Sequence, residues 1–523
     1  MLLSVSHEIP WLLVGIIFLP ITALLWYLTI PRREVNDIEG PMTNRGLVSL
    51  AVYKYKACEY TYLDEFLNPW WTFAANQLPP WIAPNVVTLL GMIFYVPSVA
   101  YMVYESQYAS ATRSSVVFAM CAFATLWYQT FDAMDGKHAR KTGVAGPLGQ
   151  LFDHGIDAMC TSISCVAVCC ALRYDVPVML LAMTSLQFPF FLGQWAEKYT
   201  HVLITNISKF MGVSETHFIA ISVFIGAAID PEHFWTQPLG GNPVINAAMT
   251  LPNATKVVSV INTVVSSIVS TVVDAIIALF RIQGSEEVSQ YWHTFNILEF
   301  QYNHVVFSVV FIGAIYMFLY SSSSVIYHII LDDEPVPGIR DTPSSKWCRI
   351  TKKIVMAFAE LIPIVYLLTL IFVWYRSSLP NSIHADQGSF FISPLLSMMM
   401  VSVLIVHLTC QMIISTMTGD PYAIFQPSFI PVTIIVLIDY VQSHYSYPIV
   451  HPYIVYFLWV STLFFNYSAQ LHWACTIVTQ ISNFFGIYVL RLGKKVKQPL
   501  VEDVRRALEL GQPIVLPRND GTI

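Results

Sequence analysis

The sequence is poor in charge. Asp, Glu, Lys and Arg make up 11% of its 523 residues, whereas hydrophobic types make up 55%. A chain this apolar lacks the polar residues needed to cover a soluble core, which excludes an ordinary soluble globular protein. The formal net charge of −6 shows no strong bias and argues against nucleic acid as a partner. We therefore expect a polytopic membrane protein.

The sequence also lacks the cysteine spacing of a metal or disulfide framework. No CxxC pair recurs at zinc spacing among its nine cysteines. Four of them lie on one apolar stretch, Cys160, Cys165, Cys169 and Cys170. We interpret the cysteines as small buried hydrophobic residues rather than ligands.

Apolar segments of about 20 residues, the length needed to cross a membrane, recur along the chain. They predict an all-α membrane helix bundle of about ten core spans plus an N-terminal anchor helix within residues 1–35. The anchor segment is followed by Arg32 and Arg33, and no convincing cleavage site is present, so a cleaved signal peptide is the weaker interpretation. The predicted core spans are 84–104, 114–131, 157–173, 177–196, 212–229, 304–327, 355–374, 391–415, 424–442 and 451–470.

The distribution of Lys and Arg predicts the orientation of this bundle. With residues 32–80 in the cytosol, the basic loop around residues 340–353 and the tail at 491–523 also fall in the cytosol, as the positive-inside rule requires. An extra span within 230–303 would reverse them, so we expect a lumenal insertion there, with an amphipathic helix. Its sequon at Asn253 is the predicted glycosylation site.

The remaining segments have less distinctive patterns. Residues 36–83 are rich in Tyr and Trp and predict an amphipathic segment at the membrane interface, with a plain linker as the alternative. Residues 84–330 are expected to form the functional bundle. Residues 331–490 are expected to serve packing or dimerisation, with a lipid-tail pocket as the minority interpretation. The stretch 471–490 is predicted as a membrane-associated helix.

One segment concentrates acidic residues in this apolar chain. On a helix Asp132, Asp135, Gly136 and Ala139 share a face, and so do Gly149, Asp153 and Asp157 on a following helix. Gly143, Gly146 and Pro147 break the helical pattern between them. The pattern predicts a cluster of four carboxylates where two helices meet water, although each Asp taken alone is compatible with an ordinary loop-facing acid.

Carboxylates this close repel one another unless a cation lies among them. Oxygen ligands favour magnesium, manganese or calcium over zinc. Small residues at Gly136, Ala139 and Gly149 leave room for a bulky ligand, and Arg140 and Lys141 suit phosphate. We therefore predict a two-metal site for a phosphoanhydride.

The spacing D-x2-D-G-x2-A-R-x8-G-x3-D-x3-D is complete here and resembles the signature of the CDP-alcohol phosphotransferase family. The segment Pro147–Gly155 and the run around Asn85 and Thr88 are similar to the choline/ethanolamine phosphotransferase branch of that family. The resemblance implies transfer of phosphoethanolamine or phosphocholine from CDP-ethanolamine or CDP-choline to diacylglycerol. It also implies magnesium, with manganese as the alternative, held by Asp132, Asp135, Asp153 and Asp157.

The resemblance further suggests residue roles. His154 is the first choice for the base and Asp157 the second, while a hydrogen-bonded structural histidine remains the alternative. Asn85 and Thr88 would line the nucleotide site, with helix capping and packing as the simpler roles. Gln150 departs from the branch, whose members commonly have Glu there, and a neutral amide cannot orient an imidazole as a carboxylate would.

Other functions compete with this one. Related enzymes of the signature use inositol or glycerol-phosphate acceptors, but they are usually shorter. A transporter would show inverted repeats and charges at the membrane midplane, whereas these carboxylates lie at one edge. A catalytically weak scaffold is disfavoured by the complete set of Asp residues. From the resemblance we also expect the endoplasmic reticulum or Golgi membrane, a cytosolic active site, membrane lipid contacts and a homodimer.

Overall fold

The computed structural model describes residues 41–108, 114–174, 176–280, 296–333, 343–377, 394–442, 450–493 and 500–510. The predicted anchor helix within residues 1–35 lies outside the described residues, as does most of the predicted tail. The described parts of that tail are residues 491–493 and the small helix α19 (Leu500–Leu510).

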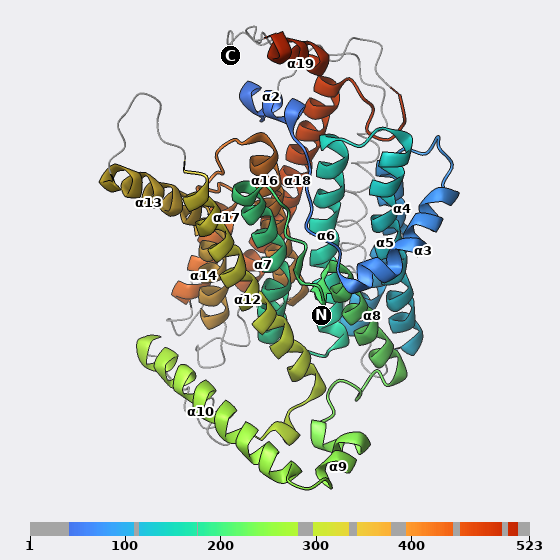
Figure 1. The fold of residues 1–523 in the computed structure, drawn as a ribbon. Helices are drawn as coiled ribbons and strands as arrows, with labels where there is room; N and C mark the ends of the chain where they lie inside the picture. The colour runs from blue at the N-terminus through green and yellow to red at the C-terminus, as the bar shows by residue number, and fades with distance from the viewer. Residues whose placement is uncertain are drawn as a thin grey trace.

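The described chain forms a helical bundle, as the apolar segments predict (Figure 1). Eight segments are long and apolar enough to cross a membrane, and two further apolar helices, α8 and α17, are shorter. The ten predicted core spans overlap ten helices, namely α4 (Pro84–Tyr108), α5 (Ser115–Thr142), α6 (Pro147–Ala171), α7 (Val176–Thr200), α8 (Val213–Ile229), α12 (Tyr302–Leu331), α14 (Ile362–Ser377), α16 (Pro394–Thr418), α17 (Phe429–Gln442) and α18 (Pro452–Phe485). The predicted polytopic bundle is confirmed.

A glycine and a proline determine where α5 ends and where α6 begins. Gly143 has a φ of 72°, the left-handed conformation that glycine adopts without steric cost, and its N–H bonds to the carbonyls of Ala139 and Arg140. Pro147 occupies the first turn of α6, where a missing N–H costs nothing. The turn between them is only a few residues long. It therefore folds the acidic end of α6 back beside the acidic end of α5.

Segments distant in sequence enclose this end of the bundle. Leu148 and Leu151 of α6 pack in one apolar cluster with residues of α2 (Asn44–Val52), α16, α18 and α19. Helix α3 (Tyr62–Gln77) packs against α5. A short antiparallel ribbon, β1 (Asn206–Ser208) and β2 (Met211–Gly212), connects α7 to α8. The acidic ends of α5 and α6 are therefore covered by parts of the chain from both termini.

The other end of the bundle carries the insertion. Helices α9 (Pro243–Met249) and α10 (Ala254–Phe280) lie at the end opposite α2 and α19 (Figure 1). The short helices η1 (Leu239–Gly241) and η2 (Ile297–Glu299) join them to α8 and α12. The helix predicted within 230–303 is thus part of α10. The acidic segment and the insertion lie at opposite ends of the molecule.

Two features of the later helices differ from the predicted spans. Helix α18 continues without a break through residues 471–485, so most of the predicted separate segment 471–490 belongs to it. Helix α13 (Pro343–Ala359) precedes α14, and together they give one candidate span, Ser345–Trp374. Length alone did not reveal either feature because hydropathy marks where a helix is apolar, not where it ends.

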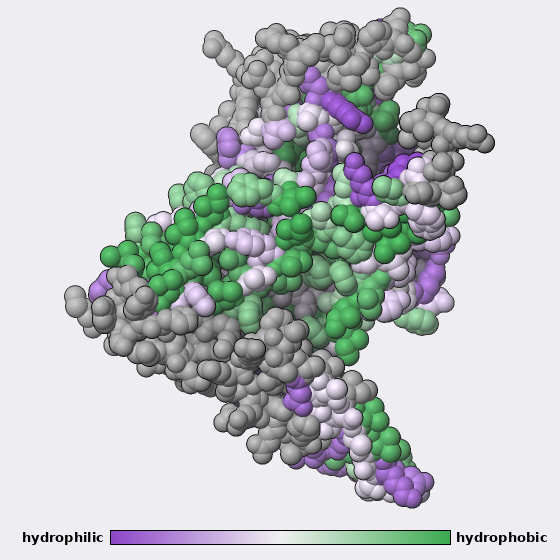
Figure 2. Space-filling model, turned by 90° about the vertical axis from the view of Figure 1, so that its left-hand side faces the viewer, coloured by the Kyte–Doolittle hydropathy of each residue, from purple (hydrophilic) through white to green (hydrophobic). Residues whose placement is uncertain are grey.

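The surface has the pattern of a lipid-facing protein. Figure 2 shows apolar side chains gathered in a broad band on one side, with polar side chains above it. Exposed apolar side chains of the described helices include Ile312 and Leu319 of α12, Val365 and Phe372 of α14, and Ile434 of α17. Soluble monomers rarely expose so large an apolar area. The protein is an integral membrane protein.

Candidate metal and phosphate site

Three of the four predicted carboxylates converge. One carboxylate oxygen from each of Asp132, Asp153 and Asp157 lies within 4.8 Å of the other two. Asp132 comes from α5, and the other two occupy successive turns of α6. All three side chains are half-buried. Such a set of oxygen atoms can hold a hard divalent cation.

Asp135 lies beside this triad rather than in it. Its carboxyl group interacts electrostatically with Asp153 and Asp157, and the Thr88 hydroxyl of α4 donates a hydrogen bond to it. Asp135 is buried. Thr88 was predicted to contact the nucleotide, but here its hydroxyl holds a carboxylate. Of the four predicted ligands, Asp135 is thus the one whose position Thr88 fixes.

The triad itself is only partly satisfied by protein groups. Tyr128 donates a hydrogen bond of 2.5 Å from its hydroxyl to Asp157 Oδ1. The buried Oδ1 of Asp153 has no hydrogen-bond partner among the described residues. Leaving a buried charged oxygen unpaired is costly, and a bound cation removes that cost. The residues therefore fit a metal ion by their chemistry as well as by their spacing.

Open space lies over the predicted glycine face. A Cβ atom added at Gly149 would meet only Asn85 Oδ1, at 3.8 Å, and one at Gly136 would meet only Arg140 Nη1, at 3.6 Å. Asn85 donates from Nδ2 to the Val489 carbonyl at 2.9 Å, which ties α4 to the chain after α18. The structure thus brings together Asn85, Gly149, Gly136 and Arg140 around the carboxylates.

Two further residues predicted to bind the substrate, Lys141 and Ala139, make hydrogen bonds within the protein. Lys141 donates from Nζ to the carbonyl of Asn76, at 3.0 Å, at the end of α3. Ala139 accepts, through its carbonyl, the N–H groups that end α5. Neither observation excludes a ligand, but both give these residues a structural role.

His154 is buried beside the carboxylates. Its Nδ1 has no hydrogen-bond partner among the residues that the structure describes. The ring of Tyr55 meets it edge-on, with centroids 5.7 Å apart. By contrast His138, which lies on the same helix as Asp135, contacts the Ile82 carbonyl at 2.9 Å and acts as a packing residue. The two rings differ only at Nε2 of His138, because Nδ1 of His138, like that of His154, is buried without a hydrogen-bond partner in the described chain. His217 of α8, whose ring meets that of Tyr128 edge-on with centroids 5.9 Å apart, has an unpartnered Nδ1 as well.

Sequence reasoning missed a polar chain next to His154. Gln150 donates from Nε2 to the Tyr53 hydroxyl at 2.9 Å, and Tyr53 donates to Glu197 Oε1 at 2.9 Å. Burial and the charge of Glu197 raise the pKa of Tyr53 above its usual range, so the phenol stays a proton donor. A signal was present in the sequence, because Glu197 is an ionisable residue at the edge of an apolar span.

The fold and the site together define a class: an integral membrane protein with a carboxylate site suited to a hard cation at one end of its bundle. Comparison with protein families makes the class specific. The family model described as CDP-alcohol phosphatidyltransferase matches residues 81–236, a stretch that covers α4 to α8 and every Asp of the site. The chain therefore carries a CDP-alcohol phosphatidyltransferase domain, and the family resemblance drawn from the Asp spacing is confirmed.

Curated relatives agree with this assignment. The chain is 35% identical over 193 residues to "Cholinephosphotransferase 1" of Saccharomyces cerevisiae, a match that covers 36% of this chain and 49% of the relative. It is 34% identical over 204 residues to "Choline/ethanolaminephosphotransferase 1" of Arabidopsis thaliana, covering 38% and 51%. The chain thus spans about half the length of these two relatives.

A longer match is more distant. An "Uncharacterized CDP-alcohol phosphatidyltransferase class-I family protein 3" of Dictyostelium discoideum is 23% identical over 459 residues, which covers 87% of this chain and 99% of the relative. The similarity therefore extends beyond the matched domain to the later helices.

Proposed function

We propose that the protein transfers phosphoethanolamine or phosphocholine from its CDP derivative to diacylglycerol, giving the phospholipid and CMP. The observation that carries the proposal is the convergence of Asp132, Asp153 and Asp157 within the matched domain. The printed names of two relatives, a cholinephosphotransferase and a choline/ethanolaminephosphotransferase, support the choice of donor.

Magnesium is the metal we propose for the site, with manganese as the alternative. Asp132, Asp153 and Asp157 would hold it, with Asp135 beside them. When bound, it would neutralise the diphosphate of the donor and the negative charge that develops on the departing CMP. Arg140, whose guanidinium lies over Gly136, would add a second positive charge near the phosphates.

A side chain of this protein would accept the proton of the acceptor hydroxyl. In the proposed reaction the acceptor hydroxyl attacks the phosphorus that carries the headgroup, and the bond to CMP breaks. His154 would accept the hydroxyl proton, because it directly follows Asp153 of the triad on α6 and its Nδ1 has no hydrogen-bond partner in the described chain. Asp157 is the weaker candidate, since it already accepts from Tyr128 and belongs to the carboxylate triad.

An apolar cavity supports a lipid acceptor. It has a volume of about 230 Å³ and lies between α4, α6, α16 and α18. Phe152 and Gly155, which flank Asp153 and His154 in the sequence, line it. A hydroxyl at the end of an acyl-bearing molecule in this cavity would lie near the proposed base. Helices α16 and α18 would then line a pocket for the lipid, in addition to the packing role expected for residues 331–490.

We further propose that the site faces the cytosol of an endoplasmic reticulum or Golgi membrane and that the enzyme is a homodimer. The orientation rests on the basic loop around residues 340–353 and on the position of the insertion at the opposite end of the bundle.

The test is CMP release by the purified full-length protein with diacylglycerol and CDP-ethanolamine or, separately, CDP-choline. We expect turnover with magnesium, loss of turnover with a chelator, and a decrease of about a hundred- to a thousandfold in Asp153→Asn, because one preorganised electrostatic contact supplies about that factor. Folded Asp153→Asn protein with normal turnover would contradict the proposal. Folded wild-type protein without turnover on either donor would point to another acceptor or to an inactive scaffold.

A further inference from the structure

Glu197 is a buried acid without a basic partner. Its side chain is 4% exposed in the last turns of α7, and no Lys or Arg of the described chain forms an ion pair with it. Tyr53 supplies a neutral hydrogen bond to one carboxylate oxygen. Burying a carboxylate is expensive unless a cation or several hydrogen bonds compensate for it. The protein alone leaves this carboxylate short of positive charge.

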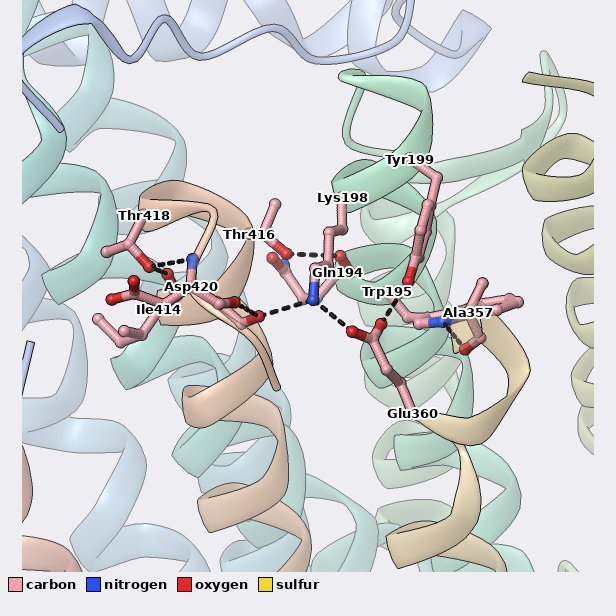
Figure 3. A network of polar contacts seen from close by, with 11 residues as sticks. Gln194, Trp195, Lys198, Tyr199, Ala357, Glu360, Ile414, Thr416, Thr418 and Asp420 are labelled. Atoms are coloured by element: carbon pink, nitrogen blue, oxygen red, sulfur yellow. Dashed lines mark hydrogen bonds and ion pairs between the residues drawn. The ribbon is translucent and has the colours of Figure 1, made fainter. Parts of the chain in front are cut away.

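The adjacent lysine does not neutralise it. Lys198 points away, toward Glu360 and Ser415, and Tyr199 donates to Glu360 at 2.8 Å (Figure 3). On the same side of α7, Trp195 donates to the Ala357 carbonyl at 3.0 Å. These contacts fix the rotation of α7. They direct the lysine to the α13–α14 corner and leave Glu197 on the side facing Tyr53 and Gln150.

Glu197 is also linked by hydrogen bonds to α6, the helix that carries Asp153, Asp157 and His154. Gln150, one turn before His154 on α6, reaches Glu197 through the Tyr53 hydroxyl, each link being 2.9 Å. Tyr55 interacts electrostatically with Glu197, Asp153 and Asp157, and its ring packs against His154. Tyr55 thus contacts His154 and is influenced by the charges of both the triad and Glu197. Tyr55, Tyr53 and Gln150 therefore connect Glu197 to the helix that carries Asp153 and Asp157.

We propose that Glu197, with Tyr53 and Tyr55, forms the subsite for the positively charged headgroup of the CDP-alcohol donor. The inference rests on the proposed function and extends it to the ammonium group. A bound ammonium supplies the positive charge that Glu197 lacks, and phenol rings beside it add favourable contacts with their faces. Burial and the charge of Glu197 raise the pKa of the half-buried Tyr53 above its usual range, so its phenol remains neutral and does not add repulsive charge near the phosphates.

The test compares two donors that differ only in headgroup charge. CDP-propanol has the shape of CDP-ethanolamine but a methyl group in place of the ammonium. We expect the full-length wild-type protein to bind CDP-ethanolamine more tightly by about tenfold or more, the value of a buried charge-assisted contact. Glu197→Gln should weaken binding of CDP-ethanolamine by a similar factor and change that of CDP-propanol less than about twofold.

Two further variants complete the design. Tyr53→Phe removes the hydroxyl that holds Glu197 and should lower the preference for the cationic donor in the same direction, which keeps the test informative if Glu197→Gln fails to fold. Glu299→Gln makes the same charge change in η2, at the opposite end of the bundle, and should leave the preference unchanged.

The outcomes separate this inference from the proposed function. An unaltered preference in folded Glu197→Gln or Tyr53→Phe protein would overturn the headgroup subsite alone. Equal binding of the two donors by the wild type would also overturn it. If the wild type bound neither donor nor CMP, the proposed function itself would fail, and this inference with it.

Discussion

At the scale of single residues, the site depends on which carboxylate oxygens have a hydrogen-bond partner in the described chain. Asp135 has Thr88, Asp157 has Tyr128, and Asp153 Oδ1 has no partner in the described chain. The unpaired oxygen lies within the group of three, where a cation would contact it. The chemistry of this end of the bundle is therefore set by a few individual hydrogen bonds.

Replacing Gly149 should stabilise the fold but weaken binding of the CDP-alcohol donor. We expect Gly149→Ala to stabilise the protein by about 0.5–1 kcal/mol, because alanine favours a helix and its Cβ would contact only Asn85 Oδ1, at 3.8 Å. The same methyl group would intrude on the proposed donor site and should raise KM for the CDP-alcohol by about tenfold. Thermal unfolding and steady-state kinetics measure the two effects.

Gly313→Ala in α12 is the matched control, since a Cβ there would meet nothing within 4 Å. It should show the gain in stability without the change in KM. An unchanged KM in Gly149→Ala would mean that the donor does not approach this face of α6.

At the scale of elements, α7 is held by its contacts with α13, α14 and α16. Lys198 and Glu360 form an ion pair whose side chains are 15% and 11% exposed. Thr416 of α16 donates to the Gln194 carbonyl at 3.1 Å, and Ser415 connects Lys198 to the chain at Asp420 (Figure 3). This network sets the rotation of α7 on which the position of Glu197 depends.

We predict that Lys198→Met lowers stability by about 3 kcal/mol, because it leaves the Glu360 carboxylate buried without its cation. The double variant Lys198→Met, Glu360→Leu should recover most of that loss, since replacing both partners removes the unpaired charge. Thermal unfolding in one detergent measures both variants.

Lys256→Met on the exposed surface of α10 controls for the loss of one positive charge and should change stability by less than about 0.5 kcal/mol. A double variant less stable than Lys198→Met would show that the pair is not the source of the effect.

At the scale of the whole molecule, the two ends of the bundle differ in what they carry. One end has the carboxylate site, α2 and α19, and the other has α9 and α10. The three sequons also differ in position and exposure. Asn253 is exposed beside α10, whereas Asn466 is buried at 3% and Asn206 bonds to the Glu59 carbonyl near α3.

We therefore predict that only Asn253 is glycosylated in cells that modify lumenal sequons. Asn253→Gln should remove the mobility shift that an endoglycosidase removes from the wild type, and Asn206→Gln and Asn466→Gln should not. A glycan at Asn206 would place the carboxylate end in the lumen and would contradict the proposed orientation.

The sequence by itself determined the helical membrane bundle and the carboxylate pattern. Hydropathy over about 20 residues reports a span directly, and the spacing of Asp132, Asp153 and Asp157 around a glycine-containing turn reports a shared face, because both depend on neighbours within a few helical turns. The family could be inferred for the same reason. The course of α18 through residues 471–485 was not foreseen, since no residue there signals whether the helix continues.

The tertiary structure alone decided which distant side chains meet. Tyr53 reaches Glu197 across 144 positions of sequence, Lys198 pairs with Glu360 rather than neutralising its neighbour, and Thr88 holds Asp135. Such contacts depend on how each helix is rotated and on which loops cover the bundle end. Packing of the complete chain fixes both, and local spacing does not encode either.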